Sequence, residues 1–380
     1  MTEKLYDLNS NLKEFSAVVL QSYQEGDTIL TVLDKTAFFP EAGGQPSDRG
    51  FIENAKVLDV RIENDVIYHI TDKLLNKGDK VNCKIDWLRR FDFMQQHSGE
   101  HIISGVAHTL YGCENVGFHL SEDIVTLDFD IPLKADQLEI IEQKANEVVF
   151  SNAEFKAYYP DKTALATLNY RSKKELVGDI RIVEIENTDM CACCAPHVKS
   201  AGQIGIIKLL SAESLRGGVR IEIKCGSRAI KDYRQKHISV QKISSLLCVK
   251  AEEVASAVAK NLDEIKNLKY ALSGYKRSII EKKVAELKYS GSVSATFEEG
   301  LEIKDLQYFA DRLFNTYGGT RGVFSGSENG FNFCICGDST LDDFFNKFKE
   351  KFAVRGGGRN GMVQGSTVAE KEEIEQFFNT

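Results

Sequence analysis

Residues 87–110 read WLRRFDFMQQHSGEHIISGVAHTL. The stretch has no proline and is rich in helix-forming residues, and Gly112 follows as a stop signal, so it predicts one long helix. His97 and His101 lie four positions apart, which puts both imidazoles on one face of that helix, with Cβ atoms about 5–6 Å apart. Two imidazoles at this spacing can chelate a single metal ion.

The sequence around this helix predicts an α+β multidomain chain with four parts. Residues 1–86 read as a small β-barrel-like domain, with a hairpin signal at Asn64–Asp65. Residues 87–228 predict an α+β domain. Residues 229–289 carry apolar side chains at three- and four-residue steps, as in a helical stalk or hairpin. Residues 290–380 predict a small α/β domain.

Three local features are expected within the last two parts. A helical hairpin would turn near Ser273 and Gly274. Residues 326–330, Gly-Ser-Glu-Asn-Gly, predict a turn between two strands. The last helix is expected to begin near Thr367, with Glu370 three residues later completing a capping box.

Composition and charge exclude several classes of protein. With 42% hydrophobic and 27% charged residues, the chain is neither disordered nor collagen-like. No apolar run approaches the roughly 18–20 residues that span a bilayer. The first residues lack the features of a secretory signal, so a cytoplasmic location is expected. The nine cysteines therefore predict metal binding or burial rather than a disulfide framework.

The charge is unevenly distributed along the chain. The net charge is −8, yet residues 229–288 alone carry +6. A basic helical segment can be a solvated helix face or a surface that meets nucleic acid, and both interpretations stay open at this point.

A second candidate for metal binding is Cys193-Cys194-Ala195-Pro196-His197. Cys193 and His197 lie four apart beside a proline, which suits a loop that donates two ligands. With His97 and His101 they form a set of nitrogen and sulfur ligands that favours zinc. Cys191 or Cys194 could replace Cys193, and the two helical histidines could instead be buried core residues.

The order of residues in the helix disfavours a zinc protease. That pattern has glutamate directly after the first histidine, whereas Ser98 stands there and Glu100 is on another side of the helical wheel. The pair Gly43-Gly44 could let a substrate approach the backbone or could form a simple tight turn.

Four ordered motifs resemble the editing domains that act on alanyl-tRNA. They are residues 34–48 (DKTAFFPEAGGQPSD), His97 with His101, Cys193 and His197 followed by residues 198–205 (VKSAGQIG), and residues 216–221 (RGGVRI). The histidine and cysteine half-sites are shared with threonyl-tRNA synthetase editing domains, and the glycine-rich loop is similar to the alanyl branch. Two departures occur: Cys194-Ala195-Pro196 stands where the family usually has glycines after the motif cysteine, and Ala42 replaces the first of three glycines before the glutamine.

The C-terminal part extends this resemblance. Residues 355–365, RGGGRNGMVQG, are similar to the glycine-rich element of the DHHA1-type domain of alanyl-tRNA synthetases. The chain therefore resembles the long, freestanding AlaX-type editing proteins. This implies a zinc-containing editing domain at residues 87–228, a glycine-rich-loop β domain before it, and a DHHA1-like domain at residues 290–380.

The resemblance also implies a function and a set of site residues. The activity would be zinc-dependent deacylation of alanine tRNA that carries serine or glycine. Thr36 is nominated to bond the serine hydroxyl, although it could simply cap the strand end. Gln45 and Glu100 are candidates for orienting water, and Gly43 and Gly44 for contacting substrate. Zinc could activate water, polarise the ester or hold the amine.

Partners follow from the same resemblance and from charge. Affinity for tRNA is expected from the basic stalk and from residues 347–359, with Arg355 and Arg359 beside glycines that could also form a flexible loop. A homodimer through the stalk or the C-terminal domain is a further expectation. The alternative functions are a zinc-stabilised RNA-binding protein without turnover and a metal-dependent hydrolase of small esters.

Overall fold

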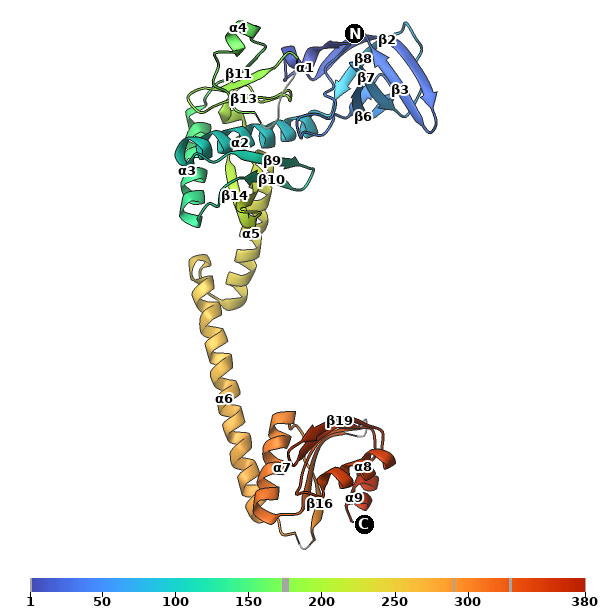
Figure 1. Cartoon of the computed structure of the whole chain (residues 1–380), viewed down its shortest axis with the longest axis vertical. Helices are drawn as coiled ribbons and strands as arrows, with labels where there is room; N and C mark the ends of the chain where they lie inside the picture. The colour runs from blue at the N-terminus through green and yellow to red at the C-terminus, as the bar shows by residue number, and fades with distance from the viewer. Residues whose placement is uncertain (1, 173–177, 290, 328–329, 380) are drawn as a thin grey trace. The chain divides into compact units, whose positions relative to one another are not determined.

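The computed structural model describes residues 2–172, 178–289, 291–327 and 330–379. These residues form two compact units, Met1–Ser239 and Val240–Thr380, each built from helices and sheets. Of the predicted α+β multidomain chain, the coarse statement is confirmed: helices and several sheets are divided between more than one unit. Figure 1 shows the elements of each unit along the chain.

A closed barrel occupies the N-terminal part of the first unit. Its strand order is β2 (Glu14–Glu25), β3 (Thr28–Leu33), β7 (Val66–Thr71), β6 (Ala55–Glu63), β5 (Gly50–Ile52) and β8 (Lys80–Ile85). The hairpin predicted at Asn64–Asp65 is confirmed: both residues have positive φ, as the tight turn between β6 and β7 requires. Short elements β1 (Glu3–Lys4), α1 (Leu5–Leu8) and β4 (Lys35–Thr36) adjoin the barrel.

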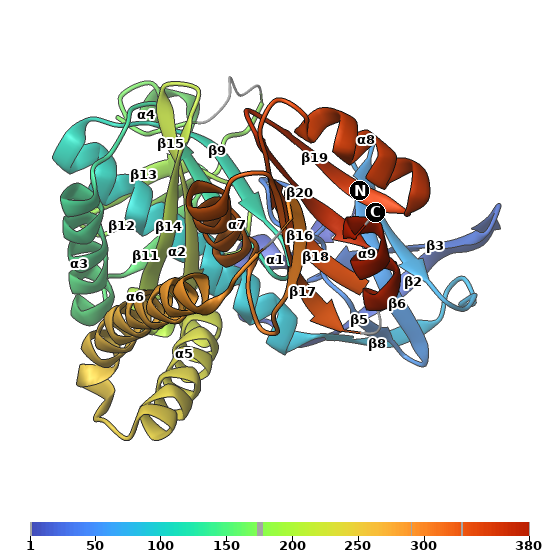
Figure 2. The same ribbon diagram turned by 90° about the horizontal axis from the view of Figure 1, so that it is seen from below.

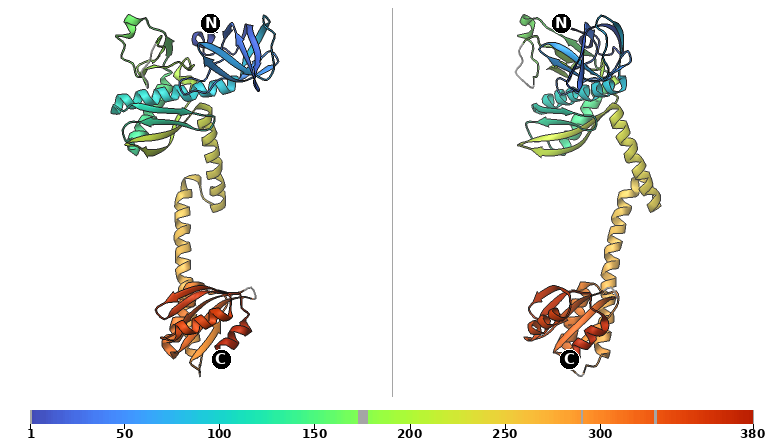
Figure 3. Two further views of the ribbon diagram at one scale, coloured as in Figure 1. Left: turned by 45° about the vertical axis from the view of Figure 1, so that its right-hand side comes forward. Right: turned by 90° about the vertical axis from the view of Figure 1, so that its right-hand side faces the viewer.

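The long helix predicted from the sequence is α2, Trp87–Tyr111. The side chain of Asp86 caps its first turn, and Gly112 ends it with φ 66°. Every residue from Phe93 to Ala107 is buried, so α2 is the central rod of its domain rather than a surface helix. Figure 3 shows α2 with a four-stranded sheet along one side and the barrel at its end.

Two further sheets and one helix surround α2. The four-stranded sheet has the order β14 (Ile207–Leu215), β15 (Gly218–Cys225), β10 (Val125–Phe129) and β9 (Asn115–Leu120). A three-stranded sheet contains β11 (Phe155–Tyr158), β12 (Ile182–Ile185) and β13 (Asp189–Ala192). Helix α3 (Ala135–Ser151) packs against α2, and a short helix, α4 (Lys162–Leu165), follows β11.

A buried ion pair joins the barrel to α2. Nε of Arg90 donates to both carboxylate oxygens of Asp48 at 2.8 and 2.9 Å, and the two side chains are 0% and 1% exposed. The guanidinium also donates to the carbonyl oxygens of Ala37, at 2.6 Å, and Ser10, at 3.2 Å. These bonds fix where the glycine-rich loop, which follows Ala37, meets the helix.

The second unit holds a five-stranded sheet with both faces covered. The sheet order is β16 (Val293–Phe297), β17 (Thr320–Ser327), β18 (Gly330–Cys336), β20 (Met362–Thr367) and β19 (Val354–Arg359). One face packs on α7 (Ile303–Tyr317) and the end of α6 (Val254–Glu286), and the other on α8 (Leu341–Lys351) and α9 (Lys371–Phe378). Figure 2 shows α7 apart from α8 and α9 across this sheet.

The predicted hairpin turn near Ser273 and Gly274 is wrong. Helix α6 runs through both residues, and the helical segment is instead interrupted between the end of α5 (Gly226–Leu247) and a 3-10 helix at Ala251–Glu253. Cys248 lies in this interruption with a positive φ of 54°, a conformation that a cysteine does not signal in sequence. Gly274 costs about 1 kcal/mol in a helix, which the 33 residues of α6 tolerate.

The predicted start of the last helix is also wrong. Thr367 ends β20, where it pairs with Phe331 and Val354, and the N-cap of α9 is Glu370. The capping interaction lies one turn later than expected, because Glu373 accepts the backbone N–H of Glu370 at 3.3 Å. The turn expected at residues 326–330 lies partly outside the described residues.

Residues Gly356–Gly358 form part of strand β19 and not a loop. A Cβ atom at Gly356 would come within 2.2 Å of the Gln364 carbonyl oxygen, and one at Gly358 within 2.0 Å of the Met362 carbonyl oxygen. The glycines therefore allow β19 to approach β20 closely.

The predicted domain limits at residues 86, 228 and 289 stay predictions, since the contacts divide the described chain into two units. Within the described ranges, no helix combines the length and apolarity needed to cross a membrane.

We expect Arg90→Ala to lower the free energy of unfolding of the first unit by about 3–5 kcal/mol, because it leaves Asp48 charged and buried. Urea denaturation followed by the fluorescence of Trp87, the only tryptophan, measures this change. Lys84→Ala is the control, since it breaks an exposed pair with Glu14 and should cost under about 0.5 kcal/mol. Equal costs for the two variants would contradict the structural role of Arg90.

Candidate metal centre

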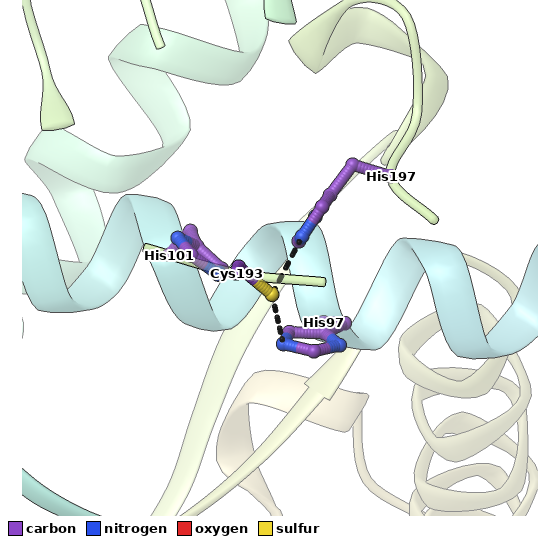
Figure 4. A group of neighbouring side chains, drawn as sticks. All are labelled: His97, His101, Cys193 and His197. Atoms are coloured by element: carbon purple, nitrogen blue, oxygen red, sulfur yellow. Dashed lines mark hydrogen bonds between the residues drawn. The ribbon is translucent and has the colours of Figure 1, made fainter. Parts of the chain in front are cut away.

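Four side chains from two distant segments converge beside α2. His97 and His101 come from one face of the helix, Cys193 directly follows β13, and His197 lies in the loop after Pro196. One ligand atom from each of the four lies within 4.8 Å of the others. Figure 4 shows Cys193 Sγ between the rings of His97 and His197. The structure thus brings together the residues that the two sequence half-sites nominated.

The distances within this cluster suit a small tetrahedral ion. Cys193 Sγ is 3.6 Å from Nε2 of His97 and 3.4 Å from Nε2 of His197. Zinc bonds of about 2.0–2.1 Å to nitrogen and 2.3 Å to sulfur place the ligand atoms of a tetrahedron about 3.5 Å apart. The donor set and its spacing therefore fit zinc.

Each imidazole in the cluster is held through its other nitrogen. Nδ1 of His97 lies 3.1 Å from Gln45 Oε1, Nδ1 of His101 lies 3.3 Å from Asp189 Oδ2, and Nδ1 of His197 lies 3.0 Å from Ser98 Oγ. The acceptors at His97 and His101 keep the ring proton on Nδ1 and leave Nε2 proton-free. Metal-binding histidines are oriented in this way, so the arrangement supports ligation through Nε2.

Asp189 is itself anchored by a cation. Nε and Nη2 of Arg171 donate to its two carboxylate oxygens, each at 2.8 Å. Burial opposes ionisation of Asp189, but hydrogen bonds from His101 and Arg171 outweigh burial and lower its pKa below the usual value. The carboxylate that orients His101 is therefore charged at neutral pH.

The geometry distinguishes the three candidate cysteines. Cys193 Sγ alone groups with all three histidines, whereas Cys191 groups with His101 and Asp189 only. Cys194 points toward the glycine-rich loop, since a Cβ atom added at Gly43 would lie 3.3 Å from its Sγ. The structure therefore favours Cys193 as the sulfur ligand.

Glu100 also faces the cluster, although the helical wheel suggested another side. Its Oε2 lies 4.0 Å from Nε2 of His97 and 3.8 Å from Nε2 of His101. Oε1 accepts hydrogen bonds from Ser104 Oγ at 2.8 Å and Asn115 Nδ2 at 2.6 Å. Glu100 is 1% exposed, so its carboxyl group is shielded from bulk water.

The glycine-rich loop forms one wall of the cluster. Gly43 and Gly44 have φ of 59° and 80°, which makes the tight turn closed by hydrogen bonds between Ala42 and Gln45. A Cβ atom at Gly44 would lie 3.0 Å from the ring of Phe118, which packs on His97 at 4.8 Å. Gly43 and Gly44 are exposed and Gln45 beside them is buried, so this wall presents backbone atoms to the solvent.

Thr36 is not in contact with the cluster. It is 0% exposed, and among the described residues its hydroxyl bonds only with His69 Nε2, at 2.8 Å, and the Phe38 N–H, at 3.1 Å. His69 Nδ1 donates to the Thr31 carbonyl at 3.0 Å, so its Nε2 must accept the Thr36 proton. Burial lowers the pKa of His69 to about 4 and keeps the ring neutral.

A cavity of about 240 Å³ lies next to His197. Its lining includes Phe155, whose ring stacks on that of His197 at 6.1 Å, together with Arg181, Lys156 and Lys199. Asp7 and Glu154 also line this cavity, and they pair with Arg181 at 3.6 Å and Lys156 at 3.4 Å.

Arg355 and Arg359 belong to the second unit and lie exposed on the edge strand β19.

Four residues that bond the cluster or Glu100 were not predicted from the sequence as site residues: Asp189, Ser98, Ser104 and Asn115. Asp189 had a signal in its position just before the cysteines, but Asn115 had none.

Two family models match parts of the chain. The model described as "tRNA synthetases class II (A)" matches residues 9–89, which include the barrel and the glycine-rich loop. The model "Threonyl and Alanyl tRNA synthetase second additional domain" matches residues 180–222, which include Cys193 and His197.

Three curated relatives share longer stretches. Alanyl-tRNA editing protein AlaX-L of Pyrococcus horikoshii is 27% identical over 98% of this chain and 96% of its own length. This chain is a relative of the alanyl-tRNA editing proteins. Alanyl-tRNA editing protein Aarsd1 of Rattus norvegicus is 33% identical over 67% of this chain and 60% of its own length. Alanine–tRNA ligase of Ignicoccus hospitalis is 30% identical over 73% of this chain and 32% of its own length.

The chain thus spans about a third of the ligase and most of AlaX-L. The C-Ala domain of Aquifex aeolicus alanyl-tRNA synthetase aligns with 25% of this chain at 18% identity, with a TM-score of 0.21 that is too low to support a conclusion.

We expect Cys193→Ser to reduce zinc affinity by at least about 100-fold, because it removes the sulfur that contacts His97 and His197. Cys191→Ser and Cys194→Ser are matched controls that should keep one zinc per chain. Metal analysis after dialysis against a competing chelator measures the difference. Loss of zinc from the Cys191 or Cys194 variant alone would assign the ligand to that cysteine.

Proposed function

We propose that this chain hydrolyses the ester bond of alanine tRNA charged with serine or glycine, with zinc held by His97, His101, Cys193 and His197. The observation that best supports this is the cluster of three imidazoles whose Nδ1 atoms are all engaged while Nε2 faces inward. AlaX-L and Aarsd1, which are named as alanyl-tRNA editing proteins, give the substrate class.

Each residue around the cluster has a separate role in the proposed hydrolysis. Zinc in this site would supply a Lewis acid that stabilises developing charge or positions the substrate amine. The exposed backbone of Gly43 and Gly44 admits the aminoacyl group close to the cluster. Glu100, buried and directed at the imidazoles, accepts a proton from the attacking water. Gln45 orients His97.

Thr36 is proposed as the residue that distinguishes serine from alanine. Its proton is donated to His69, so its oxygen can only accept a further hydrogen bond. A serine hydroxyl can donate to that oxygen and alanine cannot, and a polar contact of this kind discriminates far better than an apolar pocket. Since Thr36 is fully buried, this role requires the glycine-rich loop to move.

The second unit is proposed to bind the tRNA backbone. Lys347, Lys349 and Lys351 on α8 and Arg355 and Arg359 on β19 are all exposed. None of the five forms an ion pair with another described residue. Arg355 and Arg359 lie on the same side of the strand, about 13 Å apart at 3.3 Å per residue. Such unpaired cations suit contacts with phosphates.

Homodimer formation stays a prediction, and the exposed apolar side chains of α6 are consistent with it. Leu262, Leu268 and Leu272 are each more than half exposed. A second copy of the chain could cover them, and light scattering on the full chain measures its mass. A cytoplasmic location, where aminoacyl-tRNA is used, likewise stays a prediction.

We expect the wild-type chain to release serine from seryl-tRNA(Ala) and His101→Ala to slow this by at least about 100-fold, because a metal contributes several kcal/mol to such a step. Release of labelled serine from mischarged tRNA measures the rate. His119→Ala, which changes an exposed histidine on β9, is the control and should keep full activity.

Two other outcomes would identify the alternative functions. Tight RNA binding and bound zinc without release of serine would indicate a zinc-stabilised RNA-binding protein. Equally fast hydrolysis of a seryl nucleoside and of seryl-tRNA would indicate a hydrolase of small esters.

We expect the double variant Arg355→Ala/Arg359→Ala to reduce the slope of log affinity against log salt by up to about 1.4–1.8, since each phosphate contact contributes roughly 0.7–0.9. Its turnover at saturating tRNA should stay unchanged. Filter binding from low to high salt measures the slope, with Lys77→Ala in the barrel domain as the control. An unaltered slope would exclude these arginines from the tRNA interface.

A further inference from the structure

Glu100 is a buried carboxylate whose two oxygens have different surroundings. Oε2 faces Nε2 of His97 and His101 at 4.0 and 3.8 Å. Oε1 is turned away from them and accepts hydrogen bonds from Asn115 and Ser104. A glutamate rotates about three side-chain bonds, so this orientation persists only where the surroundings enforce it.

The two donors to Oε1 form a closed arrangement. Asn115 Nδ2 donates to Glu100 Oε1 at 2.6 Å and to Ser104 Oγ at 2.9 Å, and Ser104 Oγ donates to the same Oε1 at 2.8 Å. All three residues are buried: Asn115 is 4% exposed, Ser104 0% and Glu100 1%. Hydrogen bonds to a charged acceptor in such surroundings are stronger than neutral ones.

The backbone of β9 decides which way the Asn115 amide points. The N–H of Gly117 donates to Asn115 Oδ1 at 3.1 Å, and a backbone N–H can only donate. The oxygen of the amide is therefore held at Gly117, and its NH2 group must face Glu100. Ser104 lies one turn after Glu100 on α2, so strand and helix together fix the carboxylate.

We propose that Asn115 and Ser104 are positioning residues that hold Glu100 with Oε2 toward the metal-binding imidazoles. The proposal rests on the proposed hydrolysis, in which a water molecule gives a proton to Glu100 while its oxygen bonds to the ester carbon. The bond from that carbon to the ribose oxygen then breaks, and the proton passes to the ribose oxygen. Because Oε2 is the oxygen directed at Nε2 of His97 and His101, it is the proton acceptor in this step.

The first test measures turnover of mischarged tRNA by the full chain. Asn115→Asp replaces the donor with a carboxylate beside Glu100 and should lower kcat by about 10–100-fold, with KM and zinc content unchanged. Ser104→Ala removes one donor and should lower kcat several-fold. In a Glu100→Gln background each of these changes should alter kcat by less than about 2-fold, because residues acting through one group are not additive.

Asn146→Asp is the matched control for this test. Among the residues that the structure describes, Asn146 of α3 bonds only the backbone of Glu142 and Ile207, so its substitution affects stability without acting through Glu100. Effects of Asn115→Asp and Ser104→Ala that multiply fully with that of Glu100→Gln would overturn the proposal. If Asn115→Asp does not fold, Ser104→Ala alone decides.

The second test needs no substrate and separates this proposal from the proposed function. In protein loaded with Co²⁺, Glu100→Gln and Asn115→Asp should change the visible absorption in the same direction, and Asn146→Asp should leave it as in the wild type. An unchanged spectrum for Asn115→Asp or for Glu100→Gln would refute the positioning role. A spectral change in a chain that never deacylates tRNA would support the positioning and refute the hydrolysis.

Discussion

The polar side chains buried along α2 are the constraint on which the first unit depends. A helix enclosed on all sides must find a partner for every polar group that it carries inside, because an unsatisfied one costs about 1–3 kcal/mol. The partners come from the segment around the glycine-rich loop and from strands β15, β9 and β13: Asp48 for Arg90, Cys225 for Gln96, Gln45 for His97, Asn115 for Glu100 and Asp189 for His101. Fold and candidate metal centre therefore share one set of hydrogen bonds.

These hydrogen bonds restrain the side chains on one side of the candidate site, whereas the other side presents exposed backbone. His101 is held by Asp189, which Arg171 holds in turn, so its ring has little freedom. The opposite wall is the turn at Gly43 and Gly44, which presents exposed backbone. This arrangement of candidate ligands facing exposed backbone suits the proposed function, in which an aminoacyl group comes close to a bound metal ion.

Sequence predicted the features that depend on local chemistry. The long helix, its stop at Gly112 and the hairpin at Asn64–Asp65 follow from composition and turn-forming residues within a few positions. The interruption of the helices at Cys248 and the strand at Gly356–Gly358 were missed because a cysteine does not signal a positive φ and glycines are typical of loops. The spacing of residues indicated the four candidate ligands, whereas the contacts of Asp189 and Asn115 are made across the fold and are not encoded in spacing.

The two candidate ligand pairs are far apart along the chain. His97 and Cys193 are separated by 96 positions, and the segment between them contains α3, β9, β10 and the strands β11 to β13. A cation bound to both ends would close this long loop much as a cross-link does and would restrict the unfolded chain more than the folded one. Metal occupancy would then set the lifetime of the folded domain against unfolding, independently of any reaction on RNA.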